Sequence, residues 1–313
     1  MSLIYLKIII VIYIYINKMH QKSIINIKNL SIEIIKNILK IANDIIIFSN
    51  INQIFNFRQN MNFALLFFEP STRTNFSFQT AINKLNGTFI NYNQDYSSHQ
   101  KGESLYDTIK TMESYSDALI VRHPERGMVE KISNIASIPV INAGDGNGEH
   151  PTQALLDLFT ILQYHKPPFK IAFTGDLKNS RTVHSLIYLL EKLYDDIIYY
   201  FVSCDSLKLE ENLFNLKNKR ECDSLEQIID NIDVLYMTRI QKERHINEKN
   251  VFNINLNKKL LNKSNKNMIV LHPLPRNDEI PVELDNDPKC KYFEQMKNGV
   301  YVRMAILSQL QNS

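Results

Sequence analysis

Three hydroxyl groups and one guanidinium group are packed into four consecutive residues, Ser71-Thr72-Arg73-Thr74. The apolar run at 63–68 before them predicts a buried strand, and the stretch after them, up to Leu85, predicts a helix. A helix N-terminus supplies unpaired backbone N–H groups and the positive end of the helix dipole. Together with the hydroxyls and a bidentate arginine, these donors suit a phosphate. The alternative is that Ser71 or Thr72 only caps the helix, but a cap needs neither the arginine nor the other hydroxyls.

Two further polar motifs follow strand-like segments in the same half of the chain. Arg122 comes directly after the apolar residues 118–121. It is a candidate second cation for the same anion, because ligands collect at the carboxyl ends of parallel strands. His150 follows a segment with three of the eight glycines and precedes Pro151, which suits the first position of a helix. The helix dipole disfavours a protonated imidazole there, so we expect a neutral His150 that donates to a carbonyl oxygen. An ordinary surface arginine and a structural histidine are the alternatives.

The second half of the chain repeats the strand–turn–helix pattern. The segment 175–182 lacks the glycines of a GxGxxG motif, which disfavours dinucleotide binding. Arg181, and Arg239 after a later apolar run, both come at predicted carboxyl ends of strands. They are candidates to bind two carboxylates, with a structural ion pair as the alternative. In His272-Pro273-Leu274-Pro275 the two prolines restrict the backbone and leave carbonyl oxygens as oriented acceptors.

Strand-like and helix-like segments alternate along the chain, which is typical of an α/β protein. A helix is expected to begin after Ser31 as its cap, and the last periodic segment, 300–310, predicts a terminal helix. The 313 residues, 44% of them hydrophobic, suit two domains that each bury a core. Pro167-Pro168 marks the boundary between them. We therefore predict two domains, each a mainly parallel sheet flanked by helices.

Charge and cysteine content exclude several classes of protein. Lys and Arg number 36 and Asp and Glu 33, so the net charge of +3 and the lack of a basic stripe argue against a nucleic-acid partner. Cys204, Cys222 and Cys290 are odd in number and share no CxxC spacing, which argues against a disulfide framework and a zinc site. Free cysteines fit a reducing compartment, so a cytoplasmic location is expected.

An apolar leader occupies residues 1–20. Its apolar run, 3–16, is shorter than the ~20 residues that span a bilayer, so no membrane span is predicted. The run is similar to the apolar part of a signal peptide, but no small-residue cleavage site follows it. A disordered leader and targeting to an organelle both stay open.

As a set, the motifs resemble those of the carbamoyltransferases in order and spacing, from about residue 40 to 311, and among these the catalytic chains that use aspartate. The resemblance is carried by Ser71-Thr72-Arg73-Thr74, Arg122-His123-Pro124, His150-Pro151-Thr152-Gln153, Arg181-Thr182-Val183-His184, Thr238-Arg239-Ile240-Gln241-Lys242-Glu243-Arg244 and His272-Pro273-Leu274-Pro275. It implies transfer of a carbamoyl group from carbamoyl phosphate to the amine of L-aspartate, an early step of pyrimidine synthesis. It implies no metal and no organic cofactor.

The resemblance also implies roles for individual residues. The implied ligands of carbamoyl phosphate are Ser71, Thr72, Arg73, Thr74, Ser97, Lys101, Arg122, His150, Gln153 and the backbone carbonyls of Leu274 and Pro275. The implied ligands of aspartate are Lys101, Arg181, Arg239 and Gln241. The implied catalytic residues are Thr74, Lys101, Arg122 and His150. Carbamoyltransferases form homotrimers with shared active sites, in which Ser97 and Lys101 would come from the neighbouring chain.

In domain terms, the resemblance implies a carbamoyl phosphate-binding domain over 21–164 and an aspartate-binding domain over 165–295. A terminal helix over 296–313 would return to the first domain. The alternatives are an ornithine carbamoyltransferase, whose substrate has a second amine that Arg239 and Lys101 would repel, and a scaffold homologue without turnover, which would not need the full polar set. Whether a regulatory chain binds is left open.

Overall fold

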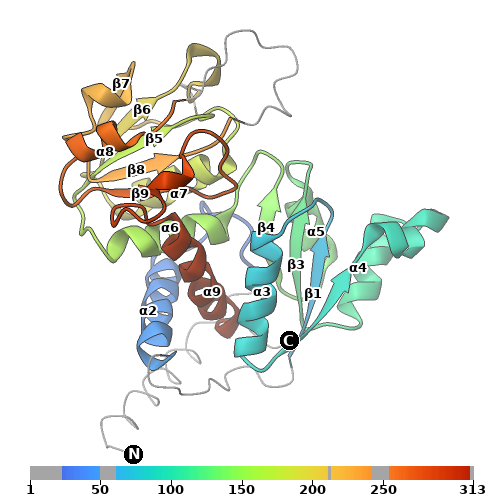
Figure 1. Ribbon diagram of the computed structural model, residues 1–313. Helices are drawn as coiled ribbons and strands as arrows, with labels where there is room; N and C mark the ends of the chain where they lie inside the picture. The colour runs from blue at the N-terminus through green and yellow to red at the C-terminus, as the bar shows by residue number, and fades with distance from the viewer. Residues whose placement is uncertain (1–22, 50–60, 211–212, 241–253, 311–313) are drawn as a thin grey trace, which may run out of the picture. The chain divides into compact units, whose positions relative to one another are not determined.

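A computed structural model of the chain describes residues 23–49, 61–210, 213–240 and 254–310 (Figure 1). The contacts within it divide the chain into two units. Unit 1 comprises residues 1–155 and 299–313, and unit 2 comprises residues 156–298. The predicted leader, 1–20, lies outside the described residues, and so does Gln241.

The described part of unit 1 contains a four-stranded parallel sheet in the order β2-β1-β3-β4. The strands are β1 (Asn62–Phe67), β2 (Thr88–Tyr92), β3 (Ala118–His123) and β4 (Val140–Asp145). In β1 the residues Phe63 to Leu66 are all buried, as expected of a parallel strand covered on both faces. The continuous apolar run therefore indicates both that this segment is a strand and that the strand lies inside the sheet, not at its edge.

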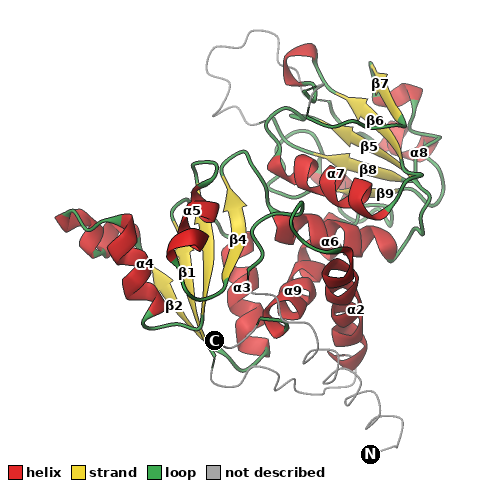
Figure 2. Cartoon of the chain, turned by 180° about the vertical axis from the view of Figure 1, so that it is seen from behind, coloured by secondary structure: helices red, strands yellow, loops and turns green. Residues whose placement is uncertain are grey.

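Helices cover both faces of this sheet. The helices of this unit are α2 (Ile32–Ser49), α3 (Arg73–Lys84), α4 (Leu105–Glu113), α5 (Met128–Ile135), the start of α6 (Pro151–Leu162) and the end of α9 (Tyr292–Ser308), with the short η1 (Gln94–Tyr96) and η2 (Ser98–Lys101) after β2. Of these, α3, α4 and α5 contact its strands. Apolar residues of α4 and α5 pack against alternate residues of β1 and β3. Figures 1 and 2 show α3 and α5 on opposite faces. The Ser31 side chain accepts from the backbone of Ile34 (3.2 Å), which confirms the predicted cap of α2.

The C-terminal helix returns to unit 1, as the resemblance implies. From Gly299 onward its residues belong to that unit. The Asn37 side chain donates to Gln309 Oε1 (2.8 Å), which joins α2 to the residues after α9. The helix begins at Tyr292, earlier than predicted from its apolar periodicity. Asn298-Gly299 has the composition of a helix stop but lies inside the helix.

Unit 2 contains, in its described part, a five-stranded parallel sheet in the order β7-β6-β5-β8-β9. Its elements are β5 (Lys170–Thr174), α7 (Arg181–Leu193), β6 (Ile198–Val202), η3 (Asp205–Leu207), β7 (Lys219–Cys222), η4 (Leu225–Gln227), β8 (Val234–Met237), α8 (Lys258–Lys263), β9 (Ile269–Leu271) and η6 (Val282–Leu284). The predicted α/β class with parallel sheets is thus confirmed in both units.

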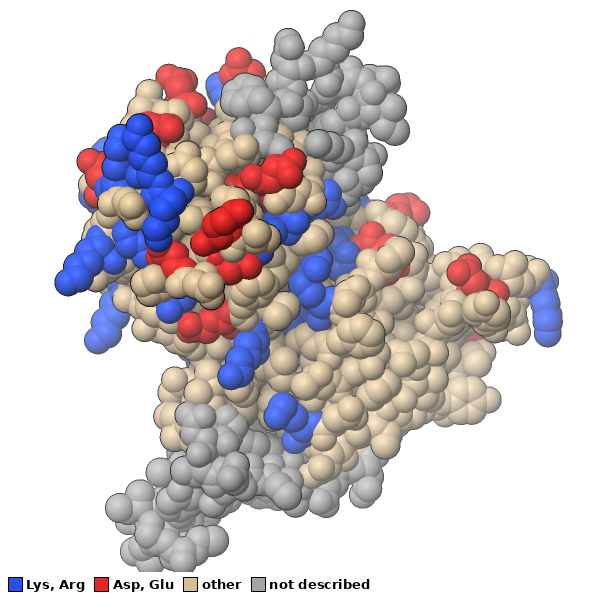
Figure 3. All heavy atoms as spheres, in the orientation of Figure 1, with Lys and Arg blue, Asp and Glu red and all other residues tan. Residues whose placement is uncertain are grey.

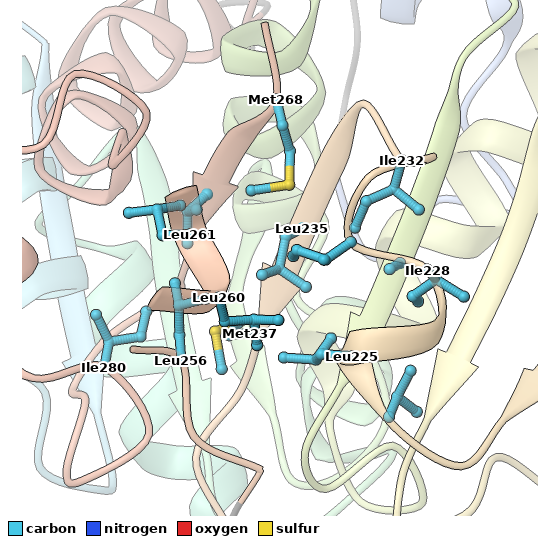
Figure 4. Packing of buried hydrophobic residues seen from close by; sticks show 14 of the residues in the cluster. Leu225, Ile228, Ile232, Leu235, Met237, Leu256, Leu260, Leu261, Met268 and Ile280 are labelled. Carbon is cyan, nitrogen blue, oxygen red and sulfur yellow. The ribbon is translucent and has the colours of Figure 1, made fainter. Parts of the chain in front are cut away.

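Strand β8 separates two environments, because successive side chains point to opposite faces of a sheet. Leu235 and Met237 lie in the apolar cluster drawn in Figure 4. Tyr236 faces the other way, where its ring centroid is 5.5 Å from that of Phe173. Its hydroxyl donates to Asp157 Oδ2 (2.7 Å). The end of this strand, which leads to Arg239, is therefore fixed from both sides.

Candidate active site

The turn between β1 and α3 carries the four consecutive polar residues. Ser71 and Thr72 lie in the turn, Arg73 begins the helix, and Thr74 is buried in its first turn. Thr72 occupies the N-cap position, but its side chain makes no capping hydrogen bond. The hydroxyl is thus not used by the helix, and the backbone N–H groups of the first turn have no partner within the helix. These features favour the anion site over the capping alternative.

Thr74 lies beside His150. Thr74 Oγ1 and His150 Nε2 are 3.4 Å apart, and both residues are buried. The carbonyl of His150 accepts from the backbone of Gln153 (2.9 Å) and Ala154 (3.1 Å), which places the histidine at the N-terminus of α6. Gln153 follows in the first turn and is also buried. The structure therefore brings together two helix starts that are far apart in the sequence.

Arg122 joins this group from the strand between them. In the sheet, β3 lies between β1 and β4, and Arg122 pairs in register with Phe67. Its Nε is 2.7 Å from Glu69 Oε1 in the β1–α3 turn, and both side chains are largely buried. Three adjacent strands thus deliver Ser71 to Thr74, Arg122 and His150 from their carboxyl ends. Glu69 lies just before the four polar residues, but sequence analysis did not select it. An acid is not expected beside an anion site, and its pairing with Arg122 becomes visible only in the structure.

The glycine-rich turn before His150 packs tightly on the loop that follows Arg122. Gly146 has a φ of +51°, and a Cβ there would be 2.6 Å from Arg126 N and 2.8 Å from Pro124 O. Asp145 accepts from Gly127 N (2.8 Å) and Val129 N (3.3 Å), so it caps α5. Gly146 therefore allows the two loops to approach closely, and this contact fixes the turn that precedes His150.

Arg303 is a buried residue of unit 1 that sequence analysis did not single out. It lies in α9, only 3% exposed, and its Nη1 donates to Ser77 Oγ (2.8 Å). Its Nη2 is 3.5 Å from Thr152 Oγ1, and its guanidinium carbon is 5.0 Å from the centroid of the Phe78 ring. Since Ser77 is in α3 and Thr152 in α6, the arginine connects the two helices that begin at the site. A charged residue inside the apolar run 302–307 was the available signal.

Ser97 and Lys101 lie in the segment that follows the edge strand β2. Lys101 is exposed, and Ser97 Oγ accepts from His99 N (3.2 Å) as the cap of η2. Ser97 Oγ is also 3.1 Å from the Tyr92 hydroxyl. Among the described residues of unit 1, no hydrogen bond or ion pair joins either side chain to the β1–α3 turn. The structure thus does not bring these two predicted residues to the group around Thr74.

In unit 2 the turns that lead to Arg181 and Arg239 are in direct contact. β5 and β8 are neighbours in the sheet, and Gly175 after β5 has a φ of +107°. A Cβ on Gly175 would be 2.0 Å from the carbonyl oxygen of Thr238, so only glycine allows this approach. Arg181 begins α7, and Arg239 follows Thr238 directly. The two arginines therefore follow the carboxyl ends of strands, as predicted, and the structure adds that these two strands are neighbours.

The loop after β9 holds Leu274 and Pro275. His272, at its start, is 1% exposed, and its Nε2 is 2.9 Å from Glu279 Oε1. Burial alone would raise the pKa of the Glu279 carboxyl, but hydrogen bonds from His272 and from backbone N–H groups hold that pKa below its ordinary value. An ionised acid is thus kept inside the protein by the donors around it.

Surface and composition add little to this site. On the face shown in Figure 3, the described residues carry both acidic and basic side chains, and the basic ones gather in places. No group of three or more His, Cys, Asp or Glu residues in the described part of the chain could hold a metal ion. None of the described helices has the length and apolar character that a bilayer crossing requires.

Comparison with protein families matches almost the whole chain. The carbamoyl-P binding domain of aspartate/ornithine carbamoyltransferases matches residues 22–163, and the Asp/Orn binding domain of the same family matches residues 168–310. The chain belongs to the aspartate/ornithine carbamoyltransferase family. Family membership confirms the resemblance seen in the motifs.

Relatives of this family favour aspartate over ornithine. The chain is 49% identical over 259 residues to an aspartate carbamoyltransferase catalytic subunit of Methanobrevibacter smithii, covering 79% of this chain and 81% of the relative. It is 41% identical over 302 residues to the corresponding subunit of Clostridium acetobutylicum, covering 92% and 97%. The family and these relatives identify the chain as a transferase, and they argue against the ornithine alternative.

Solved structures of an aspartate transcarbamoylase from Trypanosoma cruzi share the fold. Its complex with carbamoyl aspartate and phosphate has a TM-score of 0.87 at 37% identity, and covers 93% of this chain and 96% of that one. Its complex with carbamoyl phosphate has a TM-score of 0.88 at 36% identity, with the same coverage. Both carbamoyltransferase domains of the family are thus represented in this chain.

Proposed function

We propose that this chain transfers the carbamoyl group of carbamoyl phosphate to the amine of L-aspartate and releases N-carbamoyl-L-aspartate and phosphate. The observation that carries the proposal is the contact of Thr74 with His150 (3.4 Å) at the starts of two helices. Arg122 reaches the same turn through Glu69. Hydroxyl, imidazole and guanidinium donors at helix N-termini suit both a phosphate and a developing oxyanion.

The two predicted domains would each bind one substrate, with two carbonyl groups of the second domain added to the ligands of carbamoyl phosphate. Residues 21–164, with the terminal helix 296–313, would bind carbamoyl phosphate, and residues 165–295 would bind aspartate. The proposed ligands of carbamoyl phosphate in this chain are Ser71, Thr72, Arg73, Thr74, Arg122, His150, Gln153 and the carbonyls of Leu274 and Pro275. The proposed ligands of aspartate in this chain are Arg181, Arg239 and Gln241. The adjacent turns of Arg181 and Arg239 support a site for two carboxylates, one for each guanidinium.

The chemistry follows from the donors around Thr74. The aspartate nitrogen attacks the carbamoyl carbon, and the carbonyl oxygen gains negative charge as the tetrahedral intermediate forms. Thr74, Arg122 and His150 would donate to that oxygen, and their mutual contacts support donors that are oriented before the charge develops. The carbon–oxygen bond to phosphate then breaks, and the departing phosphate accepts the amine proton. Side chains position the reactants and stabilise charge, so no protein nucleophile is needed.

Ser97 and Lys101 are proposed to act in the site of a neighbouring chain of a homotrimer. Their position after an edge strand, with Lys101 exposed and Ser97 partly buried, supports this assignment. Mixing Lys101→Ala chains with Arg73→Ala chains is expected to restore activity, because one site of a mixed trimer receives neither substitution. Mixed trimers that show no recovery would count against shared sites.

We further propose a role in pyrimidine synthesis and a reducing compartment such as the cytoplasm. Three free cysteines support the compartment. Relatives from Pisum sativum are named chloroplastic, so targeting through residues 1–20 is the alternative. A fluorescent reporter fused to residues 1–30 distinguishes the two by its position in the cell.

The central experiment measures phosphate release by the purified protein. Release is expected only when carbamoyl phosphate and L-aspartate are both present. L-Ornithine in place of aspartate serves as the control for the other branch of the family. Release with ornithine but not with aspartate would overturn the proposal.

A further inference from the structure

Leu274 has a φ of +55°, in the left-handed region that residues other than glycine rarely adopt. A leucine keeps this conformation only where its surroundings hold it there, and such positions are concentrated at functional sites. The groups that hold Leu274 all lie in unit 2.

The imidazole of His272 is the direct support. Its Nδ1 accepts from the backbone N–H of Leu274 (2.8 Å). Because Nδ1 is an acceptor, the ring proton is on Nε2, which donates to Glu279 Oε1 (2.9 Å). The same carboxylate oxygen accepts from Asn277 N (3.0 Å). Glu279 thereby fixes both the tautomer and the orientation of the ring.

A second chain of hydrogen bonds fixes the beginning of the loop. His272 N donates to Gln295 Oε1 (2.9 Å), and Gln295 Nε2 donates to Asp157 Oδ1 (2.6 Å). Tyr236 donates to the other oxygen of Asp157 (2.7 Å). These four residues are all buried. The loop is thus attached to β8, α6 and α9, and Leu274 is supported on a rigid base.

The carbonyl oxygens of Leu274 and Pro275 are the groups that this support orients. Within the described residues, no hydrogen bond reaches either oxygen. The two carbonyl oxygens can accept hydrogen bonds from the two N–H groups of a single NH₂ group. A methyl group in the same place would leave both acceptors unpaired and would be rejected strongly, as sites built around a hydrogen bond reject analogues that lack it.

We propose that His272, held in its Nε2–H tautomer by Glu279, is a positioning residue that sets selectivity for a carbamoyl donor over an acyl donor without an NH₂ group, such as acetyl phosphate. The inference rests on the proposed function, in which these carbonyls receive the carbamoyl NH₂. With either donor the aspartate nitrogen bonds to the acyl carbon, the bond to phosphate breaks, and phosphate takes the amine proton. The donors differ only in the group that faces the two carbonyls.

The test compares kcat/KM for carbamoyl phosphate and acetyl phosphate, each with L-aspartate, in two matched variants. His272→Asn keeps an acceptor at the position of Nδ1, whereas His272→Gln keeps a donor at the position of Nε2 and loses that acceptor. His272→Gln is expected to reduce the ratio of the two kcat/KM values at least about tenfold. His272→Asn is expected to retain the ratio to within about threefold, and His165→Gln, outside the loop, to leave it unchanged.

A role limited to folding would lower turnover with both donors equally and leave their ratio unchanged, so an unchanged ratio in His272→Gln overturns the inference. A ratio of the two kcat/KM values that falls in His272→Asn but not in His272→Gln also overturns the inference. If His272→Gln does not fold, Glu279→Leu against Glu279→Gln provides the same comparison, with the ratio reduced only by leucine. Wild-type protein that does not carbamoylate aspartate contradicts the proposed function itself, so the two failures are distinguishable.

Discussion

The turn after β1 and the loop after β9 both follow a buried parallel strand, yet they hold their polar groups differently. In the first, Ser71 to Thr74 are consecutive and a helix start fixes them. In the second, no helix follows directly, and the backbone of Leu274 is held by His272, Glu279 and Gln295. Glu279 and Gln295 lie 7 and 23 residues from His272. Both turns are therefore visible as short motifs in the sequence, but the distant side chains that hold the second one become visible only in the folded chain.

The largest effect is expected where unit 2 depends on close packing. Gly175→Ala should destabilise the protein by about 4 kcal/mol, because an alanine there is strained and meets the Thr238 carbonyl at 2.0 Å. Gly127→Ala is the control, since its φ of +86° is similar but nothing lies within 4 Å, and about 1 kcal/mol is expected. Thermal and denaturant unfolding measure both. Equal losses would mean that the contact between these turns is unimportant.

The next effect concerns the locally fixed site of unit 1. Thr74→Val should lower kcat by about a hundredfold, or ~3 kcal/mol of barrier, because it removes one preorganised donor to the oxyanion. Thr80→Val is a matched control in the same helix, since Thr80 is exposed and donates to Phe76 O (2.7 Å). Steady-state kinetics separate the two variants. A similar fall in kcat for both would remove Thr74 from the mechanism.

A smaller effect tests whether unit 1 also depends on a distant side chain. Arg303→Met should cost about 2 kcal/mol, because the partly buried hydroxyl of Ser77 and the buried hydroxyl of Thr152 lose a charged donor. Lys297→Met, at an exposed position of the same helix, should change stability little. In a double-mutant cycle with Ser77→Ala, non-additive losses are expected. Full additivity would show that Arg303 and Ser77 do not interact energetically.

The smallest effect is expected on the pH dependence of stability, and it concerns the ion pair of Arg276 and Asp285 after β9. The hydrogen bond from Arg276 (2.7 Å to Oδ2) is the main cause that lowers the pKa of Asp285 below 3.8. A carboxyl group whose pKa is lower in the folded than in the unfolded protein stabilises the fold at pH values above its unfolded pKa. This contribution to stability is lost as the pH falls through the folded pKa. Asp285→Asn should therefore cost about 1 kcal/mol at neutral pH, since the pair is partly exposed.

The difference between wild type and Asp285→Asn should disappear well below pH 3.8. Urea unfolding at several pH values measures it. A difference that persists in acid would assign the stabilisation to packing rather than to the charge of Asp285.

Much of the fold could be predicted from the sequence because the central strands are continuous apolar runs. β1, β3, β5 and β8 are buried on both faces and were expected as strands. β7 (Lys219–Cys222) has three exposed residues, and β2 is also partly exposed. Edge strands of this kind lack a continuous apolar signal, so neither was predicted.

The candidate site, like the fold, could be predicted only where the local sequence carries a signal. Ser71 to Thr74, Arg122 and His150 were found because polar residues directly after apolar runs indicate the carboxyl ends of strands. Glu69 and Arg303 were not, since their importance depends on partners in other elements. Sequence shows which groups reach the end of a strand, whereas the groups that orient them are defined by tertiary contacts.

Helix α9 starts in unit 2, and from Gly299 its residues belong to unit 1. Unit 1 is therefore built from two segments that flank unit 2 in the sequence. Unit 2, residues 156–298, can emerge completely while unit 1 still lacks Arg303 and the Gln309 contact to Asn37. During synthesis the buried face of α2 must therefore wait until the residues after α9 have been made, so the segment of unit 1 that precedes unit 2 completes its packing only after unit 2 has been made.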